Sequence, residues 1–126
     1  MGAESDGTPR LRFRPEQKLR KGSEFDRTYQ AGRAAAGRNV TVQVAPNDLG
    51  HCRLGMAVGR KVDGSVGRYR IRRLIREAFR LRQHDFPAAC DIVVVPRRGW
   101  NEPSPQELGD ELVELVEKAL RRGTKS

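Results

Sequence analysis

The sequence of 126 residues contains few of the residue types on which catalytic sites are usually built. It has two histidines, two cysteines and one tryptophan, and aromatic residues make up 6% of the chain. No phosphate-binding Gly-x-x-x-x-Gly-Lys-Ser/Thr loop, Gly-x-Ser-x-Gly turn or cluster of metallonuclease-type carboxylates is present. His51 and His84 do not belong to a zinc-binding spacing. We therefore expect no metal site and no self-sufficient active site in this protein.

Long apolar runs are also missing. No stretch approaches the roughly 18 apolar residues that a membrane-spanning helix requires. The N-terminal residues lack both an apolar core of signal-peptide length and the acid-poor composition of a transit peptide. Cys52 and Cys90 lie far apart, at the edges of apolar runs, and we interpret them as buried free thiols rather than a disulfide. These features predict a cytoplasmic protein that does not bind membranes.

Positive charge is what the chain has in excess. It contains 25 Lys and Arg against 16 Asp and Glu, a net charge of +9. Residues 60–82 hold nine basic residues against Asp63 and Glu77, a net charge of +7, and every basic residue from Arg68 to Arg82 is arginine. Arginine forks onto phosphate and stacks on bases. We therefore expect RNA as the partner, with a helix in the DNA major groove or on an anionic membrane as weaker alternatives.

Turn and periodicity signals predict one arm and one small domain. Residues 1–17 are polar and contain two prolines, which is typical of a flexible basic arm, and residues 18–122 form the domain. A short helix is expected between Ser23, as its N-cap, and Gly32, as its stop. Alternating apolar residues at 40–44 and 54–58 flank a polar turn, which predicts an antiparallel hairpin.

The second half of the domain predicts a strand between two helices. Apolar residues at helical spacing predict an amphipathic helix over 66–83; they are Ile71, Leu74, Ile75, Ala78 and Phe79. The apolar run 91–95 is typical of an inner strand, parallel to the strand before that helix. Ser104, Pro105 and Glu107 then predict the start of a last helix, whose acidic residues suit nucleic acid least. The order α-β-β-β-α-β-α predicts an α+β fold with a small mixed sheet.

Two groups of side chains are candidates for contact with RNA. On the helix over 66–83, one face within about 100° of arc carries Tyr69, Arg72, Arg73, Arg76 and Arg80. On the first helix, Phe25 and Tyr29 lie four residues apart and therefore share a face. These two aromatic residues either belong to the core or stack on unpaired bases, which is worth about 1–3 kcal/mol per base.

Several blocks of the chain resemble the bacterial ribonuclease P protein component. The family pattern K-x-x-x-x-A-V-x-R-N-x-x-K/R-R-x-x-R-E-x-F-R is similar to residues 61–80. Residues 19–33, 54–58 and 91–97 resemble the family's opening, central strand and last strand. The resemblance extends over about residues 18–120, at matching spacing in each block.

The resemblance implies a ribonuclease P protein-like fold, which is also that of ribosomal protein S5 domain 2, with a left-handed βαβ crossover. It implies a protein subunit of ribonuclease P, monomeric by itself, that binds a catalytic RNA and precursor tRNA. The complex is an endoribonuclease that removes the 5′ leader of precursor tRNA with Mg²⁺ held mainly by the RNA. The RNA-binding residues implied are Arg60, Lys61, Arg68, Tyr69, Arg70, Arg72, Arg73, Arg76 and Arg80, and the leader cleft is implied at Phe25, Tyr29 and Gln43.

Three positions differ from the family pattern. Tyr69 replaces the asparagine between two arginines, Ser65 replaces an alanine, and Gln43 stands where the cleft often has an aromatic residue. Two other functions are alternatives to a ribonuclease P subunit. A ribosomal or other structural RNA-binding protein would not need a leader cleft, and a protein-only nuclease would need clustered acids that the sequence lacks.

Overall fold

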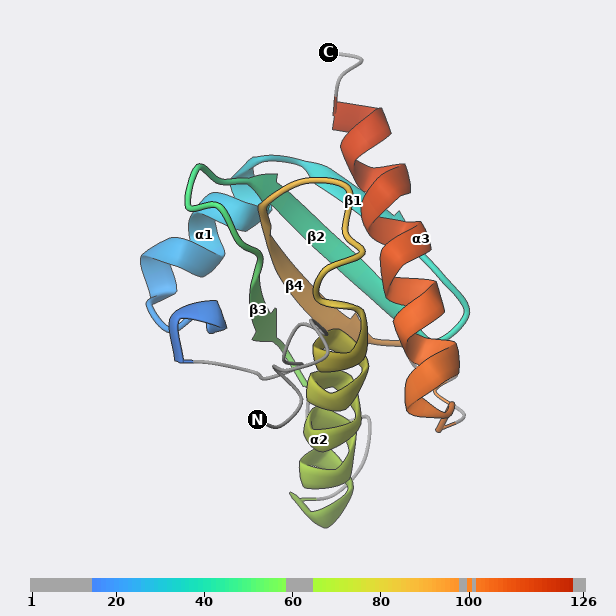
Figure 1. The fold of residues 1–126 in the computed structure, drawn as a ribbon. Helices are drawn as coiled ribbons and strands as arrows, with labels where there is room; N and C mark the ends of the chain where they lie inside the picture. Colours follow the sequence, from blue (N-terminus) through green and yellow to red (C-terminus); the bar gives the residue numbers. More distant parts are fainter. Residues whose placement is uncertain (1–14, 59–64, 98–99, 101, 124–126) are drawn as a thin grey trace, which may run out of the picture.

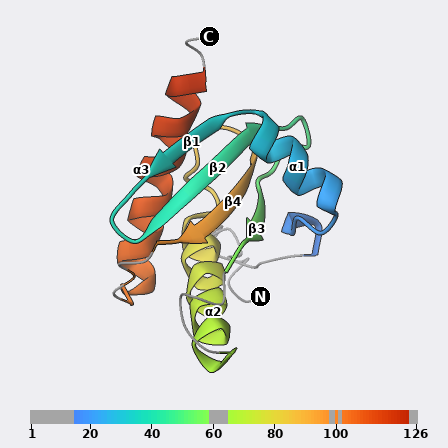
Figure 2. The ribbon, with the colours of Figure 1, turned by 180° about the vertical axis from the view of Figure 1, so that it is seen from behind.

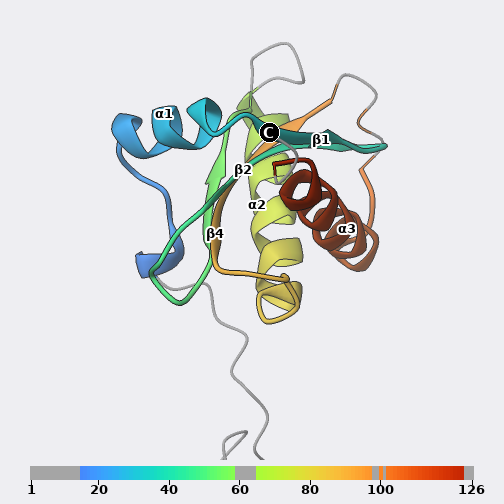
Figure 3. The same cartoon turned by 90° about the horizontal axis from the view of Figure 1, so that it is seen from above.

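The computed structural model describes residues 15–58, 65–97, 100 and 102–123. A four-stranded sheet carries α1 on one face and α2 and α3 on the other (Figures 1 and 3). In chain order the elements are η2 (Pro15–Gln17), α1 (Gly22–Gln30), β1 (Arg33–Ala36), β2 (Val40–Pro46), β3 (Arg53–Met56), α2 (Ser65–Arg82), β4 (Cys90–Pro96) and α3 (Pro105–Gly123). After the short 3-10 helix η2, this is the predicted order, and the α+β class is confirmed.

The N-terminal segment lies along the outer edge of β3. Residues 1–14 of the predicted arm lie outside the described residues. Pro15–Gln17, also assigned to that arm, form the 3-10 helix η2, in which Gln17 is buried. Leu19 then donates its N–H to the carbonyl of Leu54 at 3.0 Å. The folded part of the chain therefore includes residues from Pro15 onward.

The sheet order β1-β2-β4-β3 corrects one prediction. The antiparallel hairpin predicted between residues 40–44 and 54–58 is wrong, because β4 lies between β2 and β3 and pairs with both. The hairpin is instead formed by β1 and β2, with Ala35 opposite Val42. Ile92, Val93 and Val94 are all buried, so β4 has apolar side chains for both faces and occupies an inner position.

β3, α2 and β4 form a parallel strand–helix–strand unit, as predicted. Leu54 pairs with Ile92 and Met56 with Val94 in parallel register. In Figure 1 both strands run downwards, α2 lies in front of the sheet, and β4 lies to the right of β3. Figure 2 shows the same unit from behind. This connection is left-handed, whereas about 98% of such crossovers are right-handed. The handedness implied by the family resemblance is confirmed.

The hydrophobic core lies between the sheet and the α2–α3 layer. Val40, Val42 and Val44 alternate along β2 and are fully buried on this face. The predicted stripe of α2 is buried except for Leu74, which is partly buried. The stripe of α3 is buried throughout; it consists of Leu108, Leu112, Leu115, Val116 and Ala119. Helical periodicity thus identified the inward faces of both long helices.

Two predicted helix boundaries are confirmed. At the start of α3, Ser104 Oγ accepts the N–H of Glu107 at 3.1 Å, and Glu107 Oε1 accepts the N–H of Ser104 at 3.0 Å. These reciprocal bonds form the expected capping box. Gly32 follows the end of α1 with φ at 69°, a conformation that favours glycine.

The predicted start of α1 is wrong by two residues. The helix begins at Gly22, so Ser23 lies inside it and is not the N-cap. The carboxylate of Glu24 provides the cap instead, because its Oε1 accepts the N–H groups of Arg20 at 2.9 Å and Lys21 at 3.1 Å. A side chain inside the first turn therefore determines where this helix begins.

Cys52 and Cys90 are buried free thiols, as predicted. The fold brings them together at the start of the parallel pair, with their Sγ atoms 3.8 Å apart. The neighbouring Cys52 thiol, burial and the Asp91 carboxylate all raise the pKa of Cys90 far above its ordinary value. The thiol of Cys90 is therefore protonated at neutral pH.

Candidate nucleic-acid interface

The predicted arginine face of α2 lies away from the core. Ile71, Ile75 and Phe79 point inward and are buried, while Tyr69 is 61% exposed. The arginines of this face are exposed or half-buried, and so are two arginines beside the apolar stripe near the start of α2. The four on the face are Arg72, Arg73, Arg76 and Arg80, and the two beside the stripe are Arg68 and Arg70. Arg60 and Lys61, which the resemblance places beside them, lie outside the described residues. We refer to the six arginines together with Tyr69 as the α2 surface.

Few carboxylates compete for the α2 surface. In the part of the chain that the structure describes, Arg68, Arg72 and Arg76 have no carboxylate partner. Arg70 pairs with Glu102 at 2.6 Å and Arg80 with Glu77 at 2.5 Å. These two pairs are partly exposed to solvent, where an ion pair is worth at most about 1 kcal/mol. Most of the arginine charge of α2 is thus available to an anionic partner.

The face of the sheet under α1 differs from the core face. Three rows of paired residues cross it, and the middle row places Gln43 opposite Val93 and Val93 opposite Gly55. From Gln43 in this row to the third row, the face is partly exposed. We call this region the sheet strip; its partly exposed residues are Thr41, Gln43, Ala57 and Val95.

Phe25 and Gly55 fit together closely on this face. A Cβ atom added to Gly55 would lie 2.7 Å from Cζ of the Phe25 ring, so only glycine leaves room for the ring. A glycine within a strand often marks a close approach, and at Gly55 it is the Phe25 ring that approaches. Phe25 remains half-buried, and Tyr29, one turn later on α1, is 42% exposed.

The two candidate surfaces lie on opposite sides of the sheet. Phe25, Tyr29 and Gln43 all belong to the α1 side, so the three residues predicted for the leader cleft share one side of the sheet. The α2 surface belongs to the other layer (Figure 3). The structure therefore offers one aromatic site and one separate arginine site.

A network of buried charges under α1 was missed by the sequence analysis. Asp91 is fully buried and accepts hydrogen bonds from Arg53, Asn47 and Arg27. Burial acts to raise the pKa of Asp91, but these hydrogen bonds and the charge of Arg53 outweigh it, and the pKa lies below its ordinary value. The available signal was an acidic residue at the head of an otherwise apolar strand, since a buried carboxylate needs a partner.

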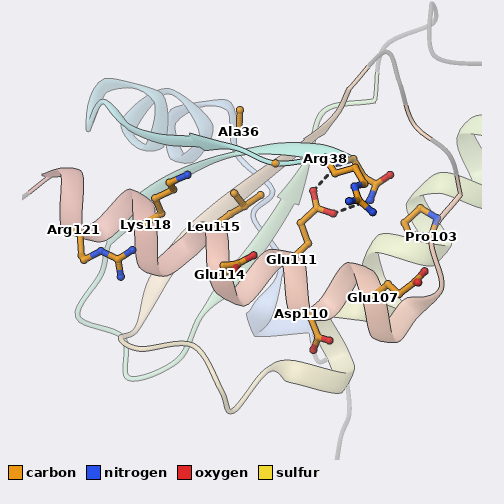
Figure 4. Close-up of a pocket in the computed structure, with 12 residues that line it drawn as sticks. Ala36, Arg38, Pro103, Glu107, Asp110, Glu111, Glu114, Leu115, Lys118 and Arg121 are labelled. Carbon is orange, nitrogen blue, oxygen red and sulfur yellow. Dashed lines mark hydrogen bonds between the residues drawn. The ribbon is translucent and has the colours of Figure 1, made fainter.

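A cavity of about 710 Å³ lies between α3 and the turn from β1 to β2 (Figure 4). Four acidic and three basic residues line it. The carboxylate of Glu111 is already engaged, because it accepts the N–H of Asn39 at 2.8 Å, the N–H of Val40 at 3.2 Å and the Asn39 side-chain amide at 2.8 Å. The residues that line this cavity have no excess of positive charge, so the cavity does not suit a polyanion.

Neither a metal-binding cluster nor a membrane-spanning helix is present among the described residues. Within the described ranges, no group of three or more His, Cys, Asp or Glu residues is arranged to hold a metal ion. The helices that the structure describes also lack the length and apolarity needed to cross a bilayer.

Comparison with known proteins identifies relatives over most of the chain. A family model described as Ribonuclease P matches residues 13–120. The ribonuclease P protein component of Syntrophobacter fumaroxidans is 42% identical over 105 residues, which covers 82% of this chain and 88% of that relative. The corresponding protein of Pelotomaculum thermopropionicum is 36% identical over 101 residues, covering 80% and 90%.

Solved structures agree with these sequence matches. The RNase P protein of Staphylococcus aureus superposes with a TM-score of 0.68 at 28% identity, covering 80% of this chain and 93% of that one. The RNase P protein of Thermotoga maritima superposes with a TM-score of 0.69 at 26% identity, covering 79% and 96%. Since both sequence and fold match over nearly the whole domain, this chain belongs to the ribonuclease P protein family.

Proposed function

We propose that this protein is the protein subunit of ribonuclease P, which binds a catalytic RNA and the 5′ leader of precursor tRNA. The observation that carries this proposal is the family match over residues 13–120. In the complex, one phosphodiester bond is hydrolysed to release the leader and give the mature 5′ end of the tRNA. The protein contributes binding to both RNAs, and each of its two surfaces has one of these roles.

The α2 surface is proposed to bind the catalytic RNA. Arg68, Arg72 and Arg76 lack carboxylate partners among the described residues, so their guanidinium groups are available to phosphates. A guanidinium donates paired hydrogen bonds to a phosphate and is weakly hydrated, which favours such contacts. A helix does not fit the deep, narrow groove of A-form RNA, so α2 is expected to lie against backbone or shaped loops.

The α1 side of the sheet is proposed to bind the single-stranded leader. Tyr29 is exposed and Phe25 is half-buried beside the sheet strip, so both rings are near unpaired bases that enter there. Stacking of a base on an aromatic ring is worth about 1–3 kcal/mol and tolerates any base. Gln43 adds an amide to the sheet strip, where the family pattern often has an aromatic residue. We therefore expect fewer stacking contacts and more hydrogen bonding at that point.

Catalysis is proposed to reside in the RNA subunit. Hydrolysis by the family requires Mg²⁺, which prefers oxygen ligands in octahedral geometry. The described residues do not fit such an ion, because they contain no suitably grouped acids and because the buried carboxylate of Asp91 is occupied by arginine and asparagine. We therefore assign the metal to the RNA and no catalytic residue to the described part of the protein.

Reconstitution tests this proposal directly. The protein is combined with a bacterial ribonuclease P RNA, and leader cleavage is measured in single turnover over a series of Mg²⁺ concentrations. The protein is expected to lower the Mg²⁺ requirement and to increase the affinity for precursor tRNA over mature tRNA. RNA binding without either effect would instead indicate a structural RNA-binding protein, and cleavage by the protein without added RNA would indicate a protein-only nuclease.

A further inference from the structure

A buried ion-pair network joins α1 to the sheet. The side chain of Asp91, at 0% exposure, accepts hydrogen bonds from Nε and Nη2 of Arg53, both at 2.8 Å. The third nitrogen of the same guanidinium, Nη1, donates to Oε2 of Glu24 at 2.9 Å. One guanidinium therefore bridges a carboxylate of β4 and a carboxylate of α1.

α1 makes a second contact with the same carboxylate. Nη2 of Arg27 donates to Oδ2 of Asp91 at 3.2 Å, while Asn47 donates its side-chain N–H to Oδ1 of Asp91 at 2.8 Å. Glu24 and Arg27 lie three residues apart and therefore on one side of the helix. The helix is held to the sheet at two points along that side.

Charged contacts of this kind fix the relative orientation of the groups they join more than they stabilise the fold. Burying Asp91 removes its hydration, and apolar residues in place of a buried ion pair are often neutral or stabilising. A forked guanidinium, by contrast, donates only in its own plane, so its partners must keep their positions. The network around Arg53 therefore restricts the rotation of α1 more than apolar packing alone would.

The side chains whose positions depend on this rotation are the two aromatic residues of α1. Phe25 directly follows Glu24 and packs against Gly55. Tyr29 lies on the same face of the helix, one turn further along. A rotation of α1 about its axis would move both rings relative to the sheet strip.

We propose that Arg53 is a positioning residue, which bridges Asp91 and Glu24 and thereby orients Phe25 and Tyr29 toward the sheet strip for binding of the leader. The inference rests on the proposed function, because it assumes that the leader binds on this side of the sheet. Arg53 itself acts through α1, since its side chain is only 14% exposed and its nitrogens are occupied by carboxylates.

The test measures the leader's contribution to binding in the reconstituted holoenzyme. This contribution is the Kd of mature tRNA divided by the Kd of the same tRNA with its leader. Glu24→Gln and Arg53→Lys are each expected to lower this ratio by about tenfold, the equivalent of one lost stacking contact. The affinity of the protein for the RNA subunit is expected to stay at the wild-type value. Asp110→Asn is the matched control, because it neutralises a carboxylate that pairs with Arg82 away from α1.

One further measurement and the choice of two variants make the outcome decisive. Amide hydrogen exchange is expected to become faster in α1 in both variants and to stay unchanged in α2 and α3. Glu24→Gln leaves the pair between Arg53 and Asp91 in place, so it carries the test if Arg53→Lys does not fold. Folded variants that keep the wild-type ratio would overturn the positioning role. A wild-type protein that does not distinguish precursor from mature tRNA would overturn the proposed function itself.

Discussion

Arginines beneath α1 and arginines on α2 have opposite surroundings in this protein. Under α1, Arg53 is 14% exposed and its guanidinium donates to two different carboxylates. On α2, Arg72 and Arg76 have no carboxylate partner among the described residues, although Glu77 directly follows Arg76 in sequence. The residue type is the same, and the carboxylates within reach decide whether its charge holds the fold together or is available to RNA.

The largest effect is expected when the buried arginine of this comparison, Arg53, is replaced. Arg53→Met leaves Asp91 buried with only Asn47 and Arg27 as partners, and the free energy of unfolding is expected to fall by about 3 kcal/mol. The measurement is urea unfolding at neutral pH. Arg73→Met, on the exposed face of α2, is the control and is expected to change the same quantity by less than about 0.5 kcal/mol. Equal losses in both variants would contradict the distinction between the two sets of arginines.

The next effect concerns the α2 surface. The double variant Arg72→Ala, Arg76→Ala is expected to weaken binding to the RNA subunit by about 10–100-fold at low salt. The slope of log K against log salt is expected to fall by about 2, because two phosphate contacts are lost. Binding is measured over a salt series, with Lys118→Ala, Arg121→Ala on α3 as a control that removes the same charge. An equal loss in the control would mean that overall charge, and not the α2 surface, determines binding.

A smaller effect concerns the pH dependence of stability. The N–H groups of Arg20 and Lys21 lower the pKa of Glu24, and the hydrogen bonds to Asp91 outweigh its burial and lower its pKa as well. Both carboxyl groups therefore stabilise the fold above their ordinary pKa of about 4, and this contribution is lost as the pH falls through and below that value.

Urea unfolding at a series of pH values measures this contribution. Between about pH 5 and pH 3, the free energy of unfolding is expected to fall more steeply in the wild type than in Asp91→Asn, which lacks one of the two groups. Parallel curves for the two proteins would show that Asp91 does not contribute through its ionisation.

The smallest expected effect sharpens the role of Tyr69. This side chain is 61% exposed and replaces the asparagine of the family pattern, so it is free to stack on a base or to bond a phosphate. Tyr69→Asn is expected to lower leader cleavage with the cognate RNA at limiting Mg²⁺, without a change in the free energy of unfolding. Tyr69→Phe separates the ring from the hydroxyl group. Wild-type cleavage by Tyr69→Asn would exclude a specific role for the tyrosine.

Local patterns were enough to predict much of the fold. The apolar stripe and the arginines of α2 follow helical spacing, and the capping box of Ser104 and Glu107 lies within four residues. Strand pairing was harder, because an alternating run such as residues 40–44 can pair with any strand whose face matches. β2 and β3 were therefore assigned to each other, although β4 separates them.

The residues of the candidate site were likewise predictable only in part from the sequence. The arginines of α2 and the pair of Phe25 and Tyr29 were identified from spacing and from the resemblance to the family. The network of Arg53 and Asp91 was not identified, because these two residues lie 38 residues apart and come into contact only when β3 and β4 pair. The close fit of Phe25 on Gly55 was missed for the same reason.

The sequence by itself determined the elements of this protein and the excess of positive charge on α2, because helical periodicity, capping and charge density are properties of neighbouring residues. Only the tertiary structure decided the strand order and the separation of two surfaces on opposite sides of one sheet, and it confirmed the left-handed crossover that the family resemblance implies. It also decided which arginines meet carboxylates. The physical reason is that burial, and an ion pair such as that of Arg53 with Asp91, depend on which distant segments come within hydrogen-bond distance. No short stretch of sequence contains both partners of such a contact.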